Sequence, residues 1–292
     1  MTLPRGARVV ARVGGGDINE AFRVALADGG EAFVKTRADA AEGEYAAEAA
    51  GLEWLARPGA LRTPRVLEVG RDHLALEWIE RGRLDAAGVE ELGRGLALTH
   101  AAGVEELGRG LALTHAPGAP GFGGLDADAP SRFGSLGLPN ERTEDWPTFY
   151  AERRLRPLAR IAAERGALSD AGVDAVERVC ERMGELVGPP EPAARLHGDL
   201  WSGNVMAGAD GRPWLIDPSA YGGHREVDLA MLRLFGAPSE RVFDAYAEQA
   251  PLADGWRERV ELYQLLPLLV HALLFGGSYR AAAERAAMRY SA

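Results

Sequence analysis

The 292-residue sequence contains one cysteine, Cys180, so it cannot form an intrachain disulfide and has no basis for a cysteine-ligated metal cluster. This scarcity is typical of proteins of the reducing cytosol. Long apolar runs are also lacking. The longest, residues 262–275, is interrupted by Gln264, Pro267 and His271 and is too short to span a bilayer. No apolar segment follows the basic start of the chain, as a signal peptide would require. We therefore expect a cytoplasmic protein without a membrane partner.

Positive charge is scarce as well. The 33 Lys and Arg residues are outnumbered by 43 Asp and Glu residues, which gives a net charge of -10. Nucleic-acid binders present a basic face, so this balance argues against a nucleic-acid partner. Apolar residues make up 47% and charged residues 26% of the chain, which are values of ordinary globular proteins.

Lysine is almost absent: 32 of the 33 basic residues are arginine, and the single lysine is Lys35. Arginine carries a planar fork, whereas lysine carries a compact charge on a flexible stem. In such a biased composition, one lysine is either a chance survivor on the surface or a residue that a guanidinium cannot replace. Composition alone leaves both interpretations open.

The first 80 residues have the pattern of strands with one helix, and the rest is mostly helical. Asp28–Gly30 has the composition of a hairpin turn. We predict strands at 7–13, 21–27, 31–36, 65–69 and 73–79, a helix at 40–56, helices at 146–165, 169–187, 227–235, 239–249, 256–275 and near the end, short strands at 194–197, 205–207 and 213–216, and a loop at 117–139. This is an α+β protein of two lobes, residues 1–80 and 81–292.

One segment occurs twice. Residues 86–100 read AAGVEELGRGLALTH, and residues 101–115 repeat these letters without a change. Fifteen residues of helix overshoot four turns by only about 60°, so the duplication preserves the apolar face of a helix. We expect only one copy to be packed, and the sequence does not say which.

The strongest chemical signal is LHGDLWSGN at residues 196–204, followed by LID at 215–217. Two short strands joined by a turn would bring Asp217 back beside Asn204. One carboxylate and one amide oxygen, together with phosphates and water, suit a hard cation such as Mg²⁺. Asp199 is then free to accept a proton from a hydroxyl. Each of these residues alone could instead cap a turn. The occurrence of Asp199, Asn204 and Asp217 together at this spacing favours the metal site.

Two further signals lie in the first lobe. The segment GGGDIN, residues 14–19, joins two predicted strands, and glycines allow a backbone to approach phosphates closely. An ordinary hairpin loop has the same composition. Lys35 ends the third strand and precedes Glu48 by thirteen residues, and a lysine oriented by an acidic residue is part of the protein-kinase design. The glycines lead into a strand, which disfavours a dinucleotide fold.

Taken together, these motifs resemble the fructosamine kinase (ketosamine 3-kinase) family. The resemblance rests on GGDIN at 15–19, FVK at 33–35, EAAGL at 48–52, LHGDLWSGN at 196–204, IDPSAYGGHREVDLAML at 216–232 and LFGGSY at 274–279. It implies a two-lobe protein-kinase-like fold, with a small antiparallel sheet and one helix before a larger helical lobe. The sequence departs from the family pattern in the duplicated segment and in Ser219.

The resemblance also implies residue roles. Asp199 would be the catalytic base, and Asn204 and Asp217 would bind Mg²⁺. ATP would contact Gly14, Gly15, Gly16, Asp17, Asn19, Lys35, Glu48 and the hinge Glu77, Trp78 and Ile79.

Around the acceptor, Trp201 would stack on the sugar or pack in the core. His224 and Arg225 would lie near the acceptor or belong to the scaffold. Asp228 and His197 would hold the catalytic loop through hydrogen bonds.

The expected reaction is phosphorylation of a sugar hydroxyl of a free or protein-bound ketosamine by MgATP, in a protein expected to be a monomer. A kinase for another small acceptor, such as an aminoglycoside or choline, is one alternative. A non-catalytic nucleotide-binding pseudokinase is the other. Loss of any one of Lys35, Asp199, Asn204 and Asp217 would be enough to make a pseudokinase, so the presence of all four argues against it.

Overall fold

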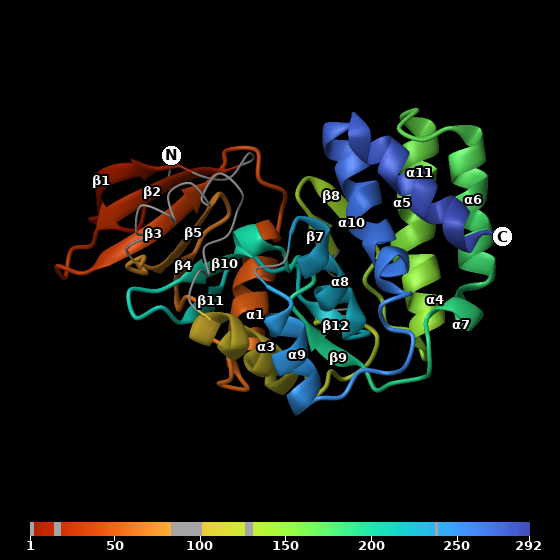
Figure 1. The fold of residues 1–292 in the computed structure, drawn as a ribbon. Helices are drawn as coiled ribbons and strands as arrows, with labels where there is room; N and C mark the ends of the chain where they lie inside the picture. Colours follow the sequence, from red (N-terminus) through yellow and green to blue (C-terminus); the bar gives the residue numbers. More distant parts are fainter. Residues whose placement is uncertain (1–2, 15–18, 83–100, 126–130, 237–238) are drawn as a thin grey trace.

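A computed structural model describes residues 3–14, 19–82, 101–125, 131–236 and 239–292. Five strands pair antiparallel in the order β1-β2-β3-β5-β4 and form the sheet on the left of Figure 1. The strands are β1 (Arg8–Val13), β2 (Glu20–Ala25), β3 (Glu31–Thr36), β4 (Val66–Val69) and β5 (His73–Glu77). All five predicted strands are confirmed, with ends shifted by one or two residues at several positions.

The hairpin between β2 and β3 forms as its composition predicts. Gly29 has a φ of 86°, a conformation that glycine adopts without strain. The backbone N–H of Gly30 donates to Asp28 Oδ1 (2.9 Å), and that of Leu26 donates to the carbonyl of Gly30 (2.8 Å). These two bonds close the turn.

Helix α1 (Glu44–Ala56) begins four residues later than predicted and lies between the sheet and the helical lobe. Tyr45, Ala49 and Leu52 pack against Leu74 and Leu76 of β5. Gly51 lies on another side, where a Cβ atom would come within 3.2 Å of Pro218 and of Ala220. The helix therefore contacts both lobes.

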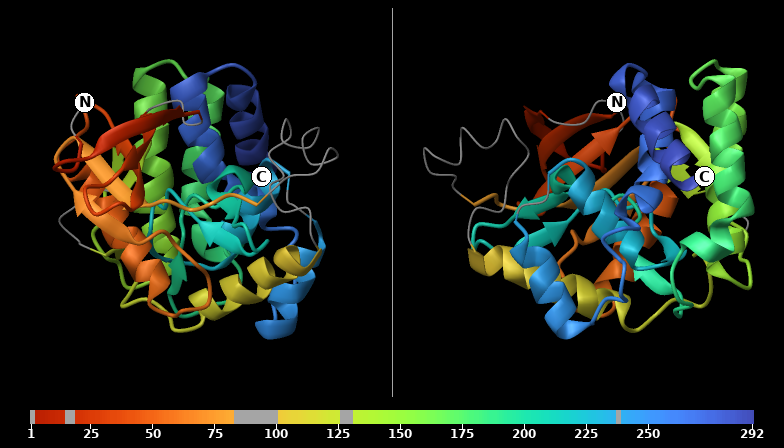
Figure 2. Two further views of the ribbon diagram at one scale, coloured as in Figure 1. Left: turned by 90° about the vertical axis from the view of Figure 1, so that its left-hand side faces the viewer. Right: turned by 45° about the vertical axis from the view of Figure 1, so that its right-hand side comes forward.

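The second copy of the duplicated segment is helix α3 (Ala101–His115). It packs side by side with α9 (Arg241–Gln249), as both views of Figure 2 show. Val104, Leu107 and Leu111 belong to a core that includes residues of α9, and Leu107 is fully buried. The first copy, residues 86–100, lies outside the described residues.

The remaining helices build the body on the right of Figure 1. The predicted helix 146–165 is continuous, but it contains a π-helical turn at Ala151–Leu155 between α4 (Trp146–Tyr150) and α5 (Arg156–Glu164). The predicted helix 169–187 is divided into α6 (Asp170–Glu181) and α7 (Met183–Leu186). The helices are α4 (Trp146–Tyr150), α5 (Arg156–Glu164), α6 (Asp170–Glu181), α7 (Met183–Leu186), α8 (Glu226–Leu234), α10 (Val260–Phe275) and α11 (Ser278–Tyr290).

Helix α10 crosses the middle of this body and contains Pro267. Because proline has no N–H, the carbonyl of Tyr263 loses its helical partner. The hydroxyl of Tyr150 donates to that carbonyl (3.1 Å), so the proline leaves no unpaired group at this point.

The prediction of a loop over residues 117–139 is wrong in part. This segment holds β6 (Gly123–Gly124), β7 (Ser131–Phe133) and β8 (Leu136–Leu138). A further unpredicted strand, β12 (Tyr221–Gly223), pairs with β6 and with β9 (Ala194–Leu196). Strands of two or three residues are too short to show a periodic pattern in the sequence, and β6 and β12 in addition pair with segments far away in the chain.

Candidate active site

Two short strands position the metal-ligand candidates as the sequence predicts. Strand β10 (Val205–Ala207) pairs antiparallel with β11 (Pro213–Leu215), so that Val205 faces Leu215. One residue further on, the N–H of Ile216 donates to the carbonyl of Asn204 (3.0 Å). Asp217, the next residue, therefore lies beside Asn204, and this geometric prediction is confirmed.

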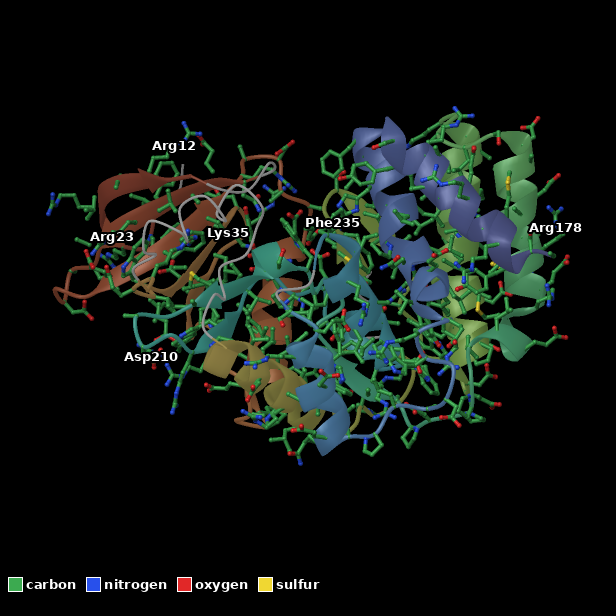
Figure 3. The ribbon with its side chains drawn as sticks, in the orientation of Figure 1. Arg12, Arg23, Lys35, Arg178, Asp210 and Phe235 are labelled. Carbon is green, nitrogen blue, oxygen red and sulfur yellow. The ribbon has the colours of Figure 1, made fainter. Side chains whose placement is uncertain are left out.

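Lys35 reaches across from the sheet to this pair. Its ammonium forms ion pairs with Glu48 of α1 and with Asp217 Oδ1, the latter at 2.9 Å. Lys35 is 6% exposed, so it is not a chance survivor on the surface. In Figure 3 it lies within the sheet lobe on the side toward the helical body.

Burial and charge act in opposite directions on these three groups. Burial lowers the pKa of Lys35, but the charges of Asp217 and Glu48 outweigh burial and raise it above its usual value. Burial raises the pKa of Glu48 to about 7 despite the nearby ammonium. At Asp217, burial also acts upward, but Lys35 holds the pKa below its usual value. Asp217 is therefore a carboxylate at neutral pH.

The backbone at Asp217 is unusual. It is the only non-glycine residue with a positive φ (54°) in the described part of the chain. Asp and Asn tolerate this left-handed conformation better than other side chains do. Strained backbone of this kind is concentrated at functional sites, where the surroundings hold it in place.

The catalytic-loop candidate, residues 197–204, is held by Asp228 of α8. Asp228 Oδ2 accepts from the N–H of His197 (2.7 Å), and Oδ1 accepts from that of Gly198 (2.9 Å). The His197 ring lies 3.3 Å from the N–H of Asp199 and 3.0 Å from the carbonyl of Ile216. Both residues fix the loop by hydrogen bonds, as predicted.

Asp199 is the group that can accept a proton. Asn204 Nδ2 donates to its carbonyl (2.8 Å) and to Oδ2 (3.0 Å). Burial, followed by the negative charge of Asp217, raises the pKa of Asp199 to about 7, although the bond from Asn204 acts downward. A carboxyl poised near neutrality suits general-base chemistry.

The donor set fits a magnesium ion. Because the amide nitrogen of Asn204 is used by Asp199, its Oδ1 remains as an acceptor. The Asp217 side chain is half exposed and offers a carboxylate. No group of three or more His, Cys, Asp or Glu residues that could hold a metal occurs among the described residues. One carboxylate and one amide oxygen match a cation that keeps waters and binds phosphates.

The glycine-rich segment is described only at its ends. Gly15, Gly16 and Asp17 lie outside the described residues. Gly14 is exposed, and Asn19 Oδ1 accepts from the hydroxyl of Tyr45 (3.1 Å), which ties the end of the segment to α1. The side chain of Asn19 is thus engaged with protein.

The proposed hinge follows β5. The side chain of Glu77 accepts from the N–H of Arg65 (2.8 Å), while the Trp78 ring lies under the guanidinium of Arg23 (4.6 Å). Trp78 Nε1 donates to Glu80 (2.8 Å), and Ile79 is half buried. The side chains of Glu77 and Trp78 have protein partners, and the N–H of Glu77 donates to the carbonyl of Arg65 (2.9 Å), so the backbone of Trp78 and Ile79 is the candidate contact for a base.

His224 and Arg225 are not brought into contact with Asp199. His224 is 2% exposed and stacks on Tyr263, and burial lowers its pKa to about 4. Arg225 forms two bonds of 2.7 Å with Glu191. These surroundings favour the scaffold role that the sequence left open for both residues.

Trp201 has a different environment. It is half buried, and its ring packs edge-on against Phe235 with centroids 5.8 Å apart.

A narrow, largely apolar pocket lies alongside Asp199, and His271 of α10 is on its wall. Its lining comprises Phe133, Gly198, Asp199, Val227, Met231, Leu266, Pro267, Val270 and His271.

Sequence reasoning missed two histidines. His115, at the end of α3, lies 3.2 Å from Asp228 Oδ2 and 2.7 Å from the hydroxyl of Tyr246. It thereby orients the carboxylate that holds the catalytic loop. His271 was seen only as an interruption of an apolar run. A histidine on an apolar helix face is the signal that could have drawn attention to either.

Comparison with known proteins decides the family. Residues 6–291 match the sequence profile of the fructosamine kinases. The chain belongs to the fructosamine kinase family. It is 35% identical to the "Probable ketoamine kinase" of Klebsiella aerogenes over 93% of this chain and 89% of that protein. Identity to the corresponding Thermus thermophilus protein is 38%, over 93% and 90% of the two chains.

Solved structures of this family confirm the expected fold. A candidate fructosamine-3-kinase from Thermobifida fusca superposes with a TM-score of 0.85 at 43% identity, covering 98% of this chain and 93% of that one. A choline/ethanolamine kinase family protein from Mesorhizobium loti gives 0.60 at 19% identity, with 96% and 86% covered, and shares the fold alone. The fold is that of protein-kinase-like phosphotransferases.

Proposed function

We propose that this chain transfers the terminal phosphoryl group of MgATP to a sugar hydroxyl of a ketosamine, such as a fructosamine or ribulosamine. The observation that carries the proposal is the meeting of Lys35 from the sheet with Glu48 and Asp217, next to Asp199 and Asn204. Membership of the fructosamine kinase family supports the acceptor class.

Binding of ATP falls to the sheet lobe. The backbone of Glu77–Ile79 contacts the adenine, Gly14–Asn19 covers the phosphates, and Lys35 neutralises phosphate charge. Glu48 orients the ammonium, which is why a compact cation is needed at this position. Asn204 and the Asp217 carboxylate would hold Mg²⁺, which would supply positive charge against the phosphates during transfer.

Asp199 acts on the acceptor. Its carboxylate accepts the proton of the hydroxyl while the hydroxyl oxygen forms its bond to the phosphorus, and ADP leaves. A pKa of about 7 allows Asp199 to be largely ionised just above neutral pH. Asp228, His197 and Asn204 hold the loop so that this carboxylate is correctly placed before the acceptor arrives.

The test compares acceptors and one isosteric variant. Wild-type protein should consume ATP with ketosamines and not with aminoglycosides or choline. Asp199→Asn should retain ATP binding and lose roughly 100- to 10,000-fold in turnover, the usual contribution of a general base.

Asp174→Asn, an exposed residue on α6, is the matched control. Turnover of aminoglycosides or choline in preference to ketosamines would reassign the acceptor. Absence of turnover with every acceptor would favour the nucleotide-binding module. Near-normal turnover by Asp199→Asn would remove the base assignment.

The proposal includes a cytosolic monomer that binds no nucleic acid, with an ATP-binding lobe in residues 1–80 and the acceptor site in residues 81–292. The single cysteine, Cys180, is buried, which agrees with a protein that does not use disulfides. No helix within the described ranges is long and apolar enough to cross a membrane. Light scattering during gel filtration tests whether the protein is a monomer.

A further inference from the structure

The motif LFGGSY at residues 274–279 builds an aromatic corner that the proposed reaction does not yet explain. Gly276 and Gly277 have φ values of 64° and 60°, which a glycine pair adopts readily. They turn the chain between α10 and α11. As a result, Phe275 and Tyr279 lie with ring centroids 6.3 Å apart, and each packs against His271, at 5.4 and 5.0 Å respectively.

This corner adjoins the narrow pocket beside Asp199, and the residue that the two share is His271. Phe235 lies 5.0 Å from His271 and 5.8 Å from Trp201, which is two residues after Asp199. His271 itself lines the pocket that contains Asp199. In Figure 3, Phe235 lies on the side of the helical body that faces the sheet. A row of rings therefore leads from the catalytic carboxylate to Phe275.

The outer end of the row, at Phe275, is exposed to solvent. Phe275 is 52% exposed, although its neighbours in α10 are largely buried. An exposed aromatic ring that packs against a pocket-lining side chain, as Phe275 does against His271, is a surface that a ligand can cover. Asp199 is the only carboxylate lining the pocket within the described ranges, and it is reserved for the reacting hydroxyl. A cation bound here would thus depend on the faces of the rings.

From this geometry we infer that Phe235, Phe275 and Tyr279 form the subsite for the protonated amine and N-linked carbon chain of the ketosamine. The inference rests on the proposed function and adds to it. In a ketosamine the amine is joined to the sugar next to the carbonyl carbon, so a sugar hydroxyl at Asp199 places the amine a few bonds away. Aromatic faces attract such a cation.

His271 is the spacer that holds the three rings together. One of its ring nitrogens, Nδ1, lies 2.7 Å from the carbonyl of Pro267, and because a carbonyl can only accept, Nδ1 carries the proton. Burial lowers the pKa of His271, so the ring is neutral at physiological pH and does not repel a bound cation.

Two matched acceptors and two variants test the subsite. The acceptors are 1-butylamino-1-deoxyfructose, which carries a cationic nitrogen, and the 1-O-butyl ether of fructose, which is uncharged. Phe275→Leu and Tyr279→Leu remove the ring but keep an apolar side chain. Met288→Ala, an exposed residue further along α11, is the control.

For both variants we expect KM for the amine to rise by about 3- to 30-fold, which corresponds to the usual strength of a cation–ring contact. KM for ATP, KM for the ether and the melting temperature should stay within about twofold or a few degrees of wild type. An unchanged KM for the amine, or an equal rise for both acceptors, would overturn the subsite and leave the proposed function standing. Wild-type protein that phosphorylates neither compound would overturn the proposed function itself, and the subsite with it.

Discussion

Deletion of one copy of the duplicated segment should leave the enzyme folded and active. Because residues 86–100 and 101–115 are identical, removal of either gives the same protein. The copy that remains has every side chain that α3 uses, including the counterparts of Leu107 and His115. The chemistry proposed above depends on residues outside both copies.

The connection that remains after deletion starts close to a segment that contacts α3. Gly82 donates to the carbonyl of Ala207 (3.2 Å), and the turn that follows Ala207 carries Arg212, whose Nε lies 3.7 Å from Glu106 of α3. The chain thus leaves Gly82 beside a turn that already contacts α3. After deletion, residues 83–85 connect Gly82 to the helix, and in extended form this connection reaches roughly 13–14 Å.

The deletion should slightly stabilise the protein. Since we expect one copy to be unpacked, removal of fifteen residues from the connection between Gly82 and α3 should lower the entropic cost of closing it by about 1–2 kcal/mol. For a chain of this size, that predicts a rise of the melting temperature of roughly 2–6 °C. Thermal unfolding with and without MgATP measures it. Loss of cooperative unfolding, or of the shift caused by nucleotide, would refute the reasoning.

A pair of point variants shows whether the copies are interchangeable. Leu107→Asp places a carboxylate in the core between α3 and α9, which costs more than about 3 kcal/mol unless another segment takes the place of the helix. Leu92→Asp is the same change in the first copy. We expect Leu92→Asp to be silent, Leu107→Asp to be partly tolerated, and the double variant to unfold. Equal damage from Leu107→Asp and the double variant would show that the first copy cannot replace α3.

Two further predictions concern single buried groups. Lys35→Arg should bind ATP poorly and be nearly inactive, because the planar guanidinium cannot place one charge between Glu48 and Asp217; wild-type ATP KM and kcat would contradict this. Burial lowers the pKa of His224 to about 4, whereas an unfolded histidine has a pKa near 6.5. The free energy of unfolding should therefore decrease by up to about 3 kcal/mol as the pH falls from 6.5 to 4. His224→Phe keeps a ring stacked on Tyr263 and should flatten that loss in urea unfolding at pH 7.5, 6 and 5; an unchanged slope would show that other groups cause it.

The parts of the site that could be predicted from sequence are those fixed by local chain geometry. HGDLWSGN and LID lie on a hairpin whose register follows from its short strands, so Asn204 and Asp217 had to approach each other. The buried place of Lys35 beside Glu48 could be expected from its rarity and from its spacing to Glu48. Each of these signals lies within a few residues of the groups that it positions.

The parts that could not be predicted depend on contacts between distant segments. β12 pairs with strands that lie some 25 and 97 residues away in the chain, and its Tyr-Gly-Gly sequence has no strand periodicity. His115 acquires its role only where α3 meets α8 and α9. His224 and Arg225 lie in a motif of the family, yet the contacts that surround them are structural.

Helix α1 links the two lobes at the candidate site. One face of the helix packs on β5, while Gly51 contacts the segment that follows Asp217. At its end, Arg195 of β9 donates to the carbonyl of Trp54 (2.6 Å) and stacks on its ring. Because α1 contacts both lobes, it places Glu48 where its carboxylate meets Lys35, which also pairs with Asp217.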